Sequence, residues 1–206
     1  KSLEDKIAFR ADHLTKYQSK RLAKRYRKRV DAIEDTALRE AVAKGYHKLL
    51  AYKDEYEVAR LLLGSRAKAE TEFAGDLKLT YHLAPPLLSR SGTDGRPKKR
   101  AFGQGMGRLF PLLAHLKMLR GTPLDVFGYT AERRMERRLI KRYEADLARL
   151  EGAADRDAAL ELARLPLQIR GFGPVKERAA AAADARRKEL LEQLKETPPS
   201  MQHAAE

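Results

Sequence analysis

Apolar residues recur at the spacing of an α-helix along most of this sequence, and this periodicity constrains the fold more than any other feature. Residues 2–30 and 35–63 each carry such a stripe, so the sequence predicts two long helices there. Each has one apolar face to bury, and we expect the two to pack as an antiparallel pair across a short turn near Asp31–Asp35. Gly64 is expected to end the second helix, and a short helix over Ser65–Phe73 is expected to follow.

A single stretch breaks the helical period. Apolar residues alternate with polar ones from Leu77 to Leu83, which is the spacing of a β-strand, and Pro85-Pro86 should end it. A turn signal at Thr93–Arg96 and a return strand over Pro97–Phe102 complete a predicted hairpin. Because an isolated two-stranded hairpin is marginally stable, we expect it to lean on the helices or on another chain.

Helical periodicity returns in the second half of the sequence. It predicts helices over four ranges, which are residues 108–119, 130 to about 150, 155–165 and 174 to about 195. Start signals support several boundaries, because Thr130 has the character of an N-cap and Pro174 suits the first turn of a helix. At the N-terminus, Ser2 and Asp5 have the spacing of a capping box.

The predicted fold class is therefore mainly α: a helical domain with one small β-hairpin or short antiparallel sheet. We expect an N-terminal helical hairpin over residues 1–64. A helical region with the small β element is expected over residues 65–206. The two together are expected to form one compact accessory domain overall.

The charge balance is strongly basic. Lysine and arginine outnumber aspartate and glutamate 43 to 29, which gives a formal net charge of +14. Such a charge favours acidic partners, of which nucleic acid, an acidic protein surface and an anionic membrane surface are the main classes. No run of about 18 apolar residues is present, so we expect no membrane span. The N-terminal residues lack the apolar core of a secretory signal, and a cytoplasmic location is expected.

The chain contains no cysteine. Disulfides, thiolate metal sites and cysteine-ligated iron–sulfur clusters are therefore excluded within these residues. The five histidines are scattered and form no metal pair of helical spacing, so we expect no metal site. His82 is expected to point away from Tyr81 and Leu83 on the predicted strand.

Adjacent carboxylates occur at Asp54 and Glu55. General acid–base chemistry needs two acids that converge on a cleft, but neighbouring residues point about 100° apart on a helix. We therefore expect ion pairs on the helix surface, with Lys53 and Arg60 as the partners.

Cations are densest between Lys16 and Arg29, where eight lie within fourteen residues. Like charges repel one another on a helix, so a partner of opposite charge would offset the repulsion. The candidates for docking an acidic partner are Lys20, Lys24, Arg27 and Lys28. The alternative is a solvated helix face. Nucleic acid is the less favoured partner, because Tyr17 and Tyr26 interleave at helical spacing that indicates core packing.

Two glycine-rich segments invite a phosphate-binding interpretation. Backbone amides at a helix start bind anions, so Gly171 and Gly173, with Lys176 close behind them, form a candidate anion site. The proline that follows Gly173 removes one of those amides, and the alternative is a tight loop whose Phe172 plugs the core. Gly103–Gly107 has GxGxG spacing without a surrounding βαβ unit, so we expect a flexible loop before a helix there.

Two predicted loops, Leu83–Pro86 and Gly121–Tyr129, join elements of different type and contain residues that fix the backbone. Loops held in this way commonly carry binding groups. The candidate functional residues in or beside them are His82, Arg120, Asp125 and Tyr129. The alternative is a rigid elbow that docks helices.

Four phrases of the sequence are more distinctive than these motifs. They are LAYKDEYEVARL at 50–61, YHLAPPLL at 81–88, LRGTPLDVFGYT at 119–130 and IRGFGPVK at 169–176. In this order they resemble the C-terminal region of the long, single-chain bacterial indolepyruvate ferredoxin oxidoreductases, and the resemblance runs from about Leu3 to Leu194. Gly103–Gly107 and Glu72–Leu77 depart from that family, which has more aromatic residues at both places.

The resemblance implies oxidative decarboxylation of aryl-2-oxo acids such as indolepyruvate to an acyl-coenzyme A. In that family, thiamine diphosphate, a divalent metal such as Mg²⁺ and [4Fe-4S] clusters carry the reaction and pass electrons to ferredoxin. Their sites precede the region that resembles this chain, so we transfer no catalytic residue and expect no cofactor here. The implied role is accessory, namely assembly, substrate access or docking, with the remainder of the oxidoreductase and ferredoxin as partners. An independent basic module that binds nucleic acid or an acidic protein stays open.

Overall fold

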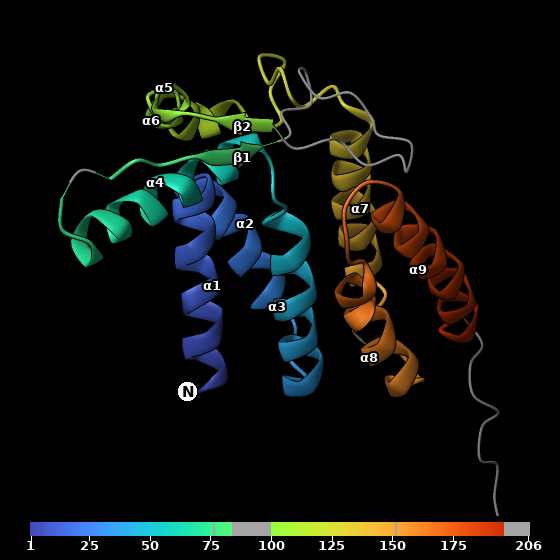
Figure 1. Cartoon of the computed structure of the whole chain (residues 1–206). Helices are drawn as coiled ribbons and strands as arrows, with labels where there is room; N and C mark the ends of the chain where they lie inside the picture. The colour runs from blue at the N-terminus through green and yellow to red at the C-terminus, as the bar shows by residue number, and fades with distance from the viewer. Residues whose placement is uncertain (76, 84–99, 151, 196–206) are drawn as a thin grey trace, which may run out of the picture. The chain divides into compact units, whose positions relative to one another are not determined.

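A computed structural model of the chain describes residues 1–75, 77–83, 100–150 and 152–195 (Figure 1). Most of these residues are helical, and the sheet found among them has two antiparallel strands. The predicted fold class, mainly α with a small β-hairpin, is confirmed. In chain order the elements are α1 (Leu3–Tyr17), α2 (Lys20–Val30), α3 (Thr36–Leu50), α4 (Glu55–Glu72), β1 (Tyr81–Leu83), β2 (Arg100–Phe102), α5 (Gln104–Gly107), α6 (Phe110–His115), η1 (Leu116–Leu119), α7 (Ala131–Leu147), α8 (Arg156–Arg164), η2 (Leu165–Gln168) and α9 (Pro174–Gln193).

The chain divides into two compact units, each described by itself below. The first unit comprises Lys1–Thr15, Lys20–Ala51 and Glu136–Glu206, and the second comprises Lys16–Ser19 and Tyr52–Met135. Residues 1–64 therefore contribute to both units. Two helices, α1 and α7, run from one unit into the other.

The first predicted helix is divided, because α1 ends at Tyr17 and α2 begins at Lys20. In a continuous helix, the last carbonyl groups of α1 would accept from amides four residues further on. Instead, the Lys117 ammonium donates to the Lys16 carbonyl at 2.7 Å, and the Arg120 guanidinium donates to the Tyr17 carbonyl at 3.0 Å. Side chains that are distant in the sequence complete this helix end, so no local pattern could reveal it.

The second predicted helix is divided as well. Asp54 lies between α3 and α4 with an extended backbone, and its side chain accepts the Glu57 amide at 2.9 Å as the N-cap of α4. The prediction that Gly64 ends a helix is wrong, because Gly64 lies inside α4 and the helix continues to Glu72. Exposed ion pairs one turn apart, Arg66 with Glu70 and Lys68 with Glu72, follow along that continuation. The short helix predicted over 65–73 is the last part of α4.

Helix starts that depend on local chemistry are confirmed. The Ser2 amide donates to Asp5 at 2.9 Å and the Asp5 amide donates to Ser2 Oγ at 3.1 Å, which completes the capping box. Thr130 Oγ1 accepts the Arg133 amide at 3.3 Å at the start of α7. Pro174 is the first residue of α9.

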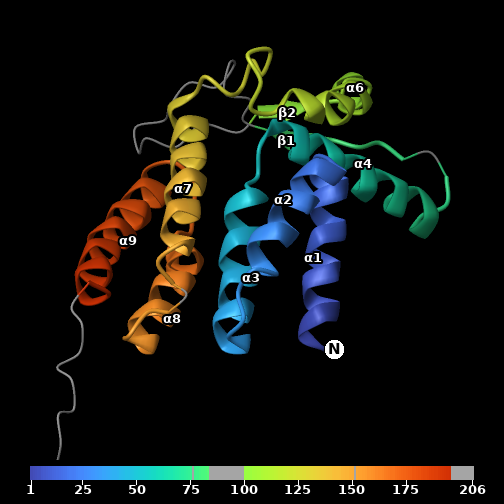
Figure 2. The ribbon, with the colours of Figure 1, turned by 180° about the vertical axis from the view of Figure 1, so that it is seen from behind.

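Three tyrosines form the centre of the first unit. The rings of Tyr26 and Tyr46 stack with centroids 6.0 Å apart, and the rings of Tyr46 and Tyr143 stack at the same distance. The hydroxyl of Tyr26 donates to the Ala43 carbonyl, and that of Tyr143 donates to the Ala163 carbonyl. Around them α8 packs on α3, while α8, α9 and residues 136–147 of α7 lie side by side in both views (Figures 1 and 2).

The hairpin belongs to the second unit and leans on its helices, as predicted. Strand β1 pairs with β2 in the register Tyr81 to Phe102, and Tyr81 meets the Phe110 ring edge to face at 4.8 Å. Ala59 of α4 completes this small core. The first strand is shorter than predicted, since Leu77–Thr80 is not paired, and residues 97–99 of the predicted return strand lie outside the described residues. The predicted turn at 93–96 and the double proline at 85–86 lie outside the described residues. Gly103–Gly107, predicted as a flexible loop, contains the short helix α5.

Candidate functional site

The second unit encloses a cluster of charged and aromatic side chains around Arg120, which is 6% exposed. Its guanidinium donates to both carboxylate oxygens of Asp54, with Nε 2.5 Å from Oδ2 and Nη2 2.9 Å from Oδ1. The guanidinium carbon lies 3.8 Å from the centroid of the Tyr17 ring, in cation–π contact. Arg120 therefore ties the end of α1 to the start of α4 and to the segment that follows η1.

Asp125 organises the segment between η1 and α7. One of its carboxylate oxygens accepts the Gly121 amide at 2.8 Å. The other accepts the Gly128 amide and the Tyr56 hydroxyl, both at 3.1 Å. A side chain on Gly128 would collide with this carboxylate, because an added Cβ would lie 2.7 Å from Asp125 Oδ2. Asp125 is 3% exposed and fixes the segment from within.

The phenols of this cluster remain protonated near neutral pH. Burial, aided by the negative charge of Asp54, raises the pKa of Tyr17 far above its ordinary value and that of Tyr52 to about 12. Burial also raises the pKa of Tyr56, and its bond to Asp125 adds to the effect. Burial alone would lower the pKa of Arg120, but its bonds to Asp54 outweigh that effect and raise it. These three phenols therefore act in the cluster as neutral hydrogen-bonding and aromatic groups.

The prediction of surface ion pairs from Asp54 and Glu55 to Lys53 and Arg60 is wrong. Asp54 is buried against Arg120, and Arg60 pairs with Glu57 at 2.6 Å. Glu55 Oε1 lies 3.6 Å from Arg133 Nη2. Its second oxygen is buried with no hydrogen-bond partner in the described part of the chain, and burial raises the pKa of this carboxyl.

Of the four loop candidates, the structure brings Arg120 and Asp125 together through Tyr56 and places the other two apart. Tyr129 is exposed and its hydroxyl donates to the Pro123 carbonyl at 2.7 Å. His82 is exposed on β1, pointing away from Tyr81 as predicted. Sequence reasoning assigned Asp54 to a surface ion pair and missed its role as an N-cap, although an aspartate three residues before Glu57 carries the local signature of one.

The basic helix α2 presents three of its four candidate cations to solvent. Lys20, Lys24 and Lys28 are exposed and make no ion pair with any described residue. Arg27 differs, since its Nη1 lies 2.5 Å from Glu4 Oε1 and its Nε lies 3.2 Å from Asp31 Oδ2. The bond to Glu4 raises the pKa of Arg27. Arg27 is therefore a structural residue and not a free docking group.

The candidate anion site at Gly171, Gly173 and Lys176 is occupied by the protein's own charge. The Lys176 ammonium donates to Glu136, whose side chain is buried on α7. Both glycines have positive φ, of 96° and 53°, which turns the chain into α9. Phe172 is 68% exposed, so the alternative that it plugs the core is wrong.

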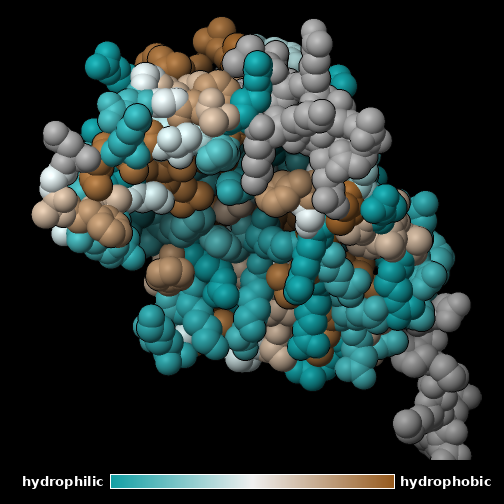
Figure 3. Space-filling view, in the orientation of Figure 1, coloured by the Kyte–Doolittle hydropathy of each residue, from teal (hydrophilic) through white to brown (hydrophobic). Residues whose placement is uncertain are grey.

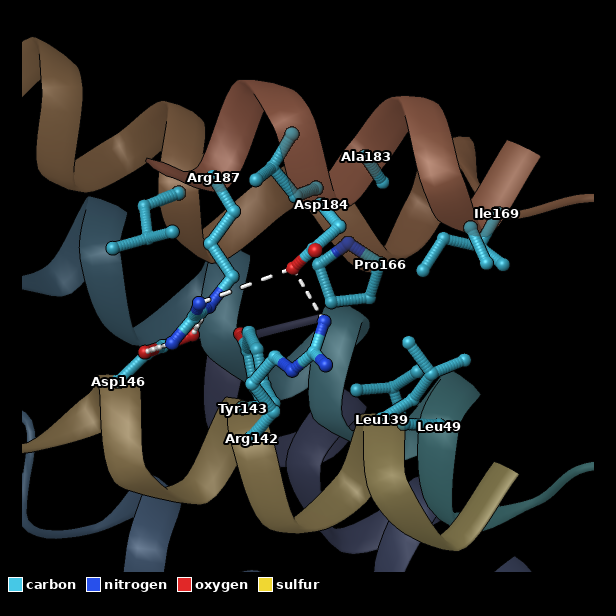
Figure 4. Close-up of a pocket in the computed structure, with 13 residues that line it drawn as sticks. Leu49, Leu139, Arg142, Tyr143, Asp146, Pro166, Ile169, Ala183, Asp184 and Arg187 are labelled. Atoms are coloured by element: carbon cyan, nitrogen blue, oxygen red, sulfur yellow. Dashed lines mark hydrogen bonds and ion pairs between the residues drawn. The ribbon is translucent and has the colours of Figure 1, made fainter. Parts of the chain in front are cut away.

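A small cavity of about 40 Å³ lies in the first unit between α7, α8 and α9 (Figure 4). Its walls are mainly apolar and include Leu139, Leu162, Ile169 and Ala183. At its rim Arg187 holds Asp146 with two hydrogen bonds of 2.6 Å, and Arg142 pairs with Asp184. The volume suits one or two water molecules, so the cavity is too small for a metabolite.

Neither a metal-ligating cluster nor a membrane helix occurs in the part of the chain that the structure describes. No three histidine, aspartate or glutamate side chains converge there as ligands would. No helix among the described residues has the length and apolar character to cross a bilayer.

These features define a basic, mainly helical protein whose buried charges are largely engaged within the fold. The chain belongs to a family of unknown function (DUF6537), whose model matches residues 3–189. No curated protein matches the chain. No solved structure matches it either.

Proposed function

We propose that this chain is an accessory region of an oxidoreductase resembling the indolepyruvate ferredoxin oxidoreductases, and that α2 docks an acidic partner there. The four phrases within 50–176 support the first part. The exposed row Lys20, Lys24 and Lys28 is the observation that carries the second. In this proposal the enzyme is cytoplasmic, and thiamine diphosphate, Mg²⁺ and [4Fe-4S] clusters belong to other parts of it.

The positions of the cations on α2 do not stabilise the helix. Residues four apart lie about 6 Å apart along a helix axis, so Lys20, Lys24 and Lys28 repel one another. The first turn also holds Arg21 beside Lys20 and contains no acidic residue, although the positive end of the helix dipole favours acids there. An acidic surface laid along this row would offset both unfavourable terms.

The partner implied by the resemblance is ferredoxin, which is generally acidic. Complementary charge raises the rate of encounter more than it tightens the final complex. The effect weakens as salt shortens the Debye length to about 8 Å near physiological ionic strength. The role of Lys20, Lys24 and Lys28 is therefore to steer the electron acceptor toward the enzyme.

The test uses the full-length enzyme with Lys20→Gln, Lys24→Gln and Lys28→Gln combined. We expect ferredoxin reduction to slow severalfold at low salt while reduction of a small neutral dye is unchanged. The matched control removes three exposed cations that have no ion pair with described residues, through Arg149→Gln, Arg164→Gln and Arg178→Gln. The proposal is contradicted if both triple variants slow ferredoxin reduction equally, or if neither variant slows it. Loss of dye reduction as well would assign the row to internal packing.

The net charge of +14 favours a second candidate function, an independent module that binds nucleic acid. Titration of the isolated chain with duplex DNA at several salt concentrations tests it. A log–log slope that falls in magnitude in the Lys20, Lys24 and Lys28 variant would support phosphate contacts by this row. An open reading frame that encodes a thiamine-dependent region upstream would favour the first candidate.

A further inference from the structure

The segment Leu109–Leu119 in the second unit carries apolar residues on both its inner and its outer side, and His115 and Lys117 are its polar members. Its inner side packs into the small core, where Phe110 is buried against Tyr81 and Leu113 lies beside it. Its outer side carries Leu109, Leu112 and Met118, which are 50%, 58% and 57% exposed. Large apolar side chains that are exposed close together commonly mark a surface that another molecule covers.

The segment that follows η1 presents a second set of exposed apolar residues. Leu124, Val126 and Tyr129 are 70%, 62% and 62% exposed. Between them, Asp125 is buried in its hydrogen bonds and the Phe127 ring meets the Tyr56 ring at 5.3 Å. Residues of this segment therefore point alternately inward and outward. The inward contacts of Asp125 and Phe127 hold the exposed side chains of Leu124, Val126 and Tyr129 in one arrangement.

Figure 3 shows hydrophobic side chains gathered along the upper edge of the molecule, over the part of the chain where Figure 1 places α5 and α6. We call Leu109, Leu112, Met118, Leu124, Val126 and Tyr129 the outer apolar surface. Scattered exposed apolar residues need no explanation, but six within twenty-one positions of one unit indicate an interaction site.

The exposed charges in the same stretch of the chain have one sign. Between Arg100 and Met135 the exposed charged side chains are Arg100, Arg108 and Arg134. The two carboxylates of this stretch are engaged, since Asp125 is buried and Glu132 lies 3.8 Å from Arg133. An apolar centre with a charged rim is the common anatomy of a protein–protein interface. A cationic rim selects a partner whose own rim is acidic.

We propose that the outer apolar surface docks an acidic protein surface that carries exposed leucine-like side chains at its centre. Fixed geometry favours a protein partner over an anionic bilayer. The Asp125 anchor holds the outer side chains in one shape, which improves the fit to another fixed surface but brings no benefit in a fluid lipid interface. This surface is separate in sequence from α2 and does not depend on the oxidoreductase assignment.

The test measures binding of the full chain to a fluorescent amphipathic peptide that has leucines on one helical face and glutamates on the other. We expect saturable binding that weakens at least tenfold when Leu112→Asp and Leu124→Asp are combined. The matched control is Phe9→Asp with Phe172→Asp, since these two rings are 71% and 68% exposed outside the surface. We expect the control to change the affinity less than twofold. Thermal unfolding verifies that each variant is folded.

Three outcomes would overturn the proposal. One is the absence of saturable binding by the unmodified chain. Another is equal weakening by the two pairs of substitutions, which would show non-specific apolar contact. The third is a result in which the chain binds phosphatidylglycerol vesicles but not the peptide, and in which Leu112→Asp with Leu124→Asp abolishes the vesicle binding. That result would assign the surface to a membrane. Retained peptide binding in the Lys20, Lys24 and Lys28 variant separates this surface from the docking proposed for α2.

Discussion

Arg120 and Asp54 form a buried, two-bonded ion pair across 66 positions of the sequence, with neither side chain more than 3% exposed. The pair does three tasks at once. It neutralises two charges, it keeps Asp54 in place to cap α4, and it brings the guanidinium to the last carbonyl of α1. The unit is held together at this point by one arginine from a segment without regular structure.

We therefore predict a large loss of stability in Arg120→Met. The substitution leaves Asp54 as a buried charge without its partner, and breaking a buried pair in this way costs about 3–5 kcal/mol. Urea unfolding of the variant measures the loss. The companion variant Asp54→Asn, combined with Arg120→Met, should lose much less than the sum of the two single changes. A loss below about 1 kcal/mol in Arg120→Met would contradict the prediction.

How much of this fold is predictable from the sequence depends on the range of the interactions. The capping box of Ser2 and Asp5, the N-cap Thr130 and the first-turn Pro174 are local, and each was predicted correctly. The ends of α1 and α3 were not predicted. At Tyr17 the decisive group is a guanidinium 103 positions away, and periodicity continues across the break because both helices bury the same kind of residue.

The same distinction applies to the candidate site. The sequence singles out Arg120 and Asp125 as polar residues in an apolar loop, and the structure buries both in hydrogen bonds within the fold. Tyr17 was assigned to a core, but its cation–π contact with Arg120 depends on the tertiary fold. On α2, the exposure of Lys20, Lys24 and Lys28 follows from helical spacing, whereas the pairing of Arg27 with Glu4 requires α1 to lie alongside.

We predict that alanine substitutions at two helical glycines, Gly45 and Gly64, change the stability in opposite directions. An added Cβ at Gly45 would lie 2.6 Å from the Ala163 carbonyl oxygen and 3.0 Å from the Tyr143 hydroxyl, so α3 and α8 would have to separate. Overpacking of this kind costs about 1–3 kcal/mol. An added Cβ at Gly64 would meet nothing within 4 Å, and helix propensity predicts a gain of up to about 1 kcal/mol. Thermal unfolding of Gly45→Ala and Gly64→Ala should shift in opposite directions, and shifts of the same sign would refute this packing.

Because His13 and His47 form a partly buried pair, we predict that the protein loses stability in mild acid. His47 Nε2 lies 3.1 Å from His13 Nδ1, and burial, aided by the positive charges of His13 and Arg10, lowers the pKa of His47 to about 4. The folded state therefore binds fewer protons than the unfolded state between about pH 6.5 and 4. This contribution is present at neutral pH and is lost as the pH falls through that window.

Substitution of His47 measures its contribution to the pH dependence of stability. A shift from 6.5 to about 4 corresponds to roughly 3 kcal/mol of stability. In His47→Gln the free energy of unfolding should fall less steeply between pH 6.5 and 4 than in the unmodified chain. His82→Gln serves as the control, because His82 is exposed on β1 and its replacement should leave the slope unchanged. Parallel pH profiles for the unmodified chain and His47→Gln would refute the prediction.

Two neighbouring arginines on α9 form ion pairs of similar geometry whose carboxylates differ in burial. Arg187 binds Asp146 with two bonds of 2.6 Å, and Arg186 binds Glu161 with bonds of 2.6 and 2.7 Å. The Asp146 side chain is 3% exposed and that of Glu161 is 39% exposed. Removal of Arg187 therefore strands a carboxylate at the rim of the cavity in Figure 4, whereas removal of Arg186 leaves Glu161 in water.

We predict that Arg187→Gln lowers the free energy of unfolding by about 3 kcal/mol, because an unpaired buried charge is strongly destabilising. Arg186→Gln should lower it far less, since exposed pairs contribute little. Urea unfolding at low salt and in 1 M sodium chloride provides the measurement. Salt should reduce the small effect of Arg186→Gln and leave most of the effect of Arg187→Gln, because a buried pair is weakly screened. Equal losses in the two variants would contradict the prediction, because they would show that Asp146 reaches solvent when Arg187 is removed.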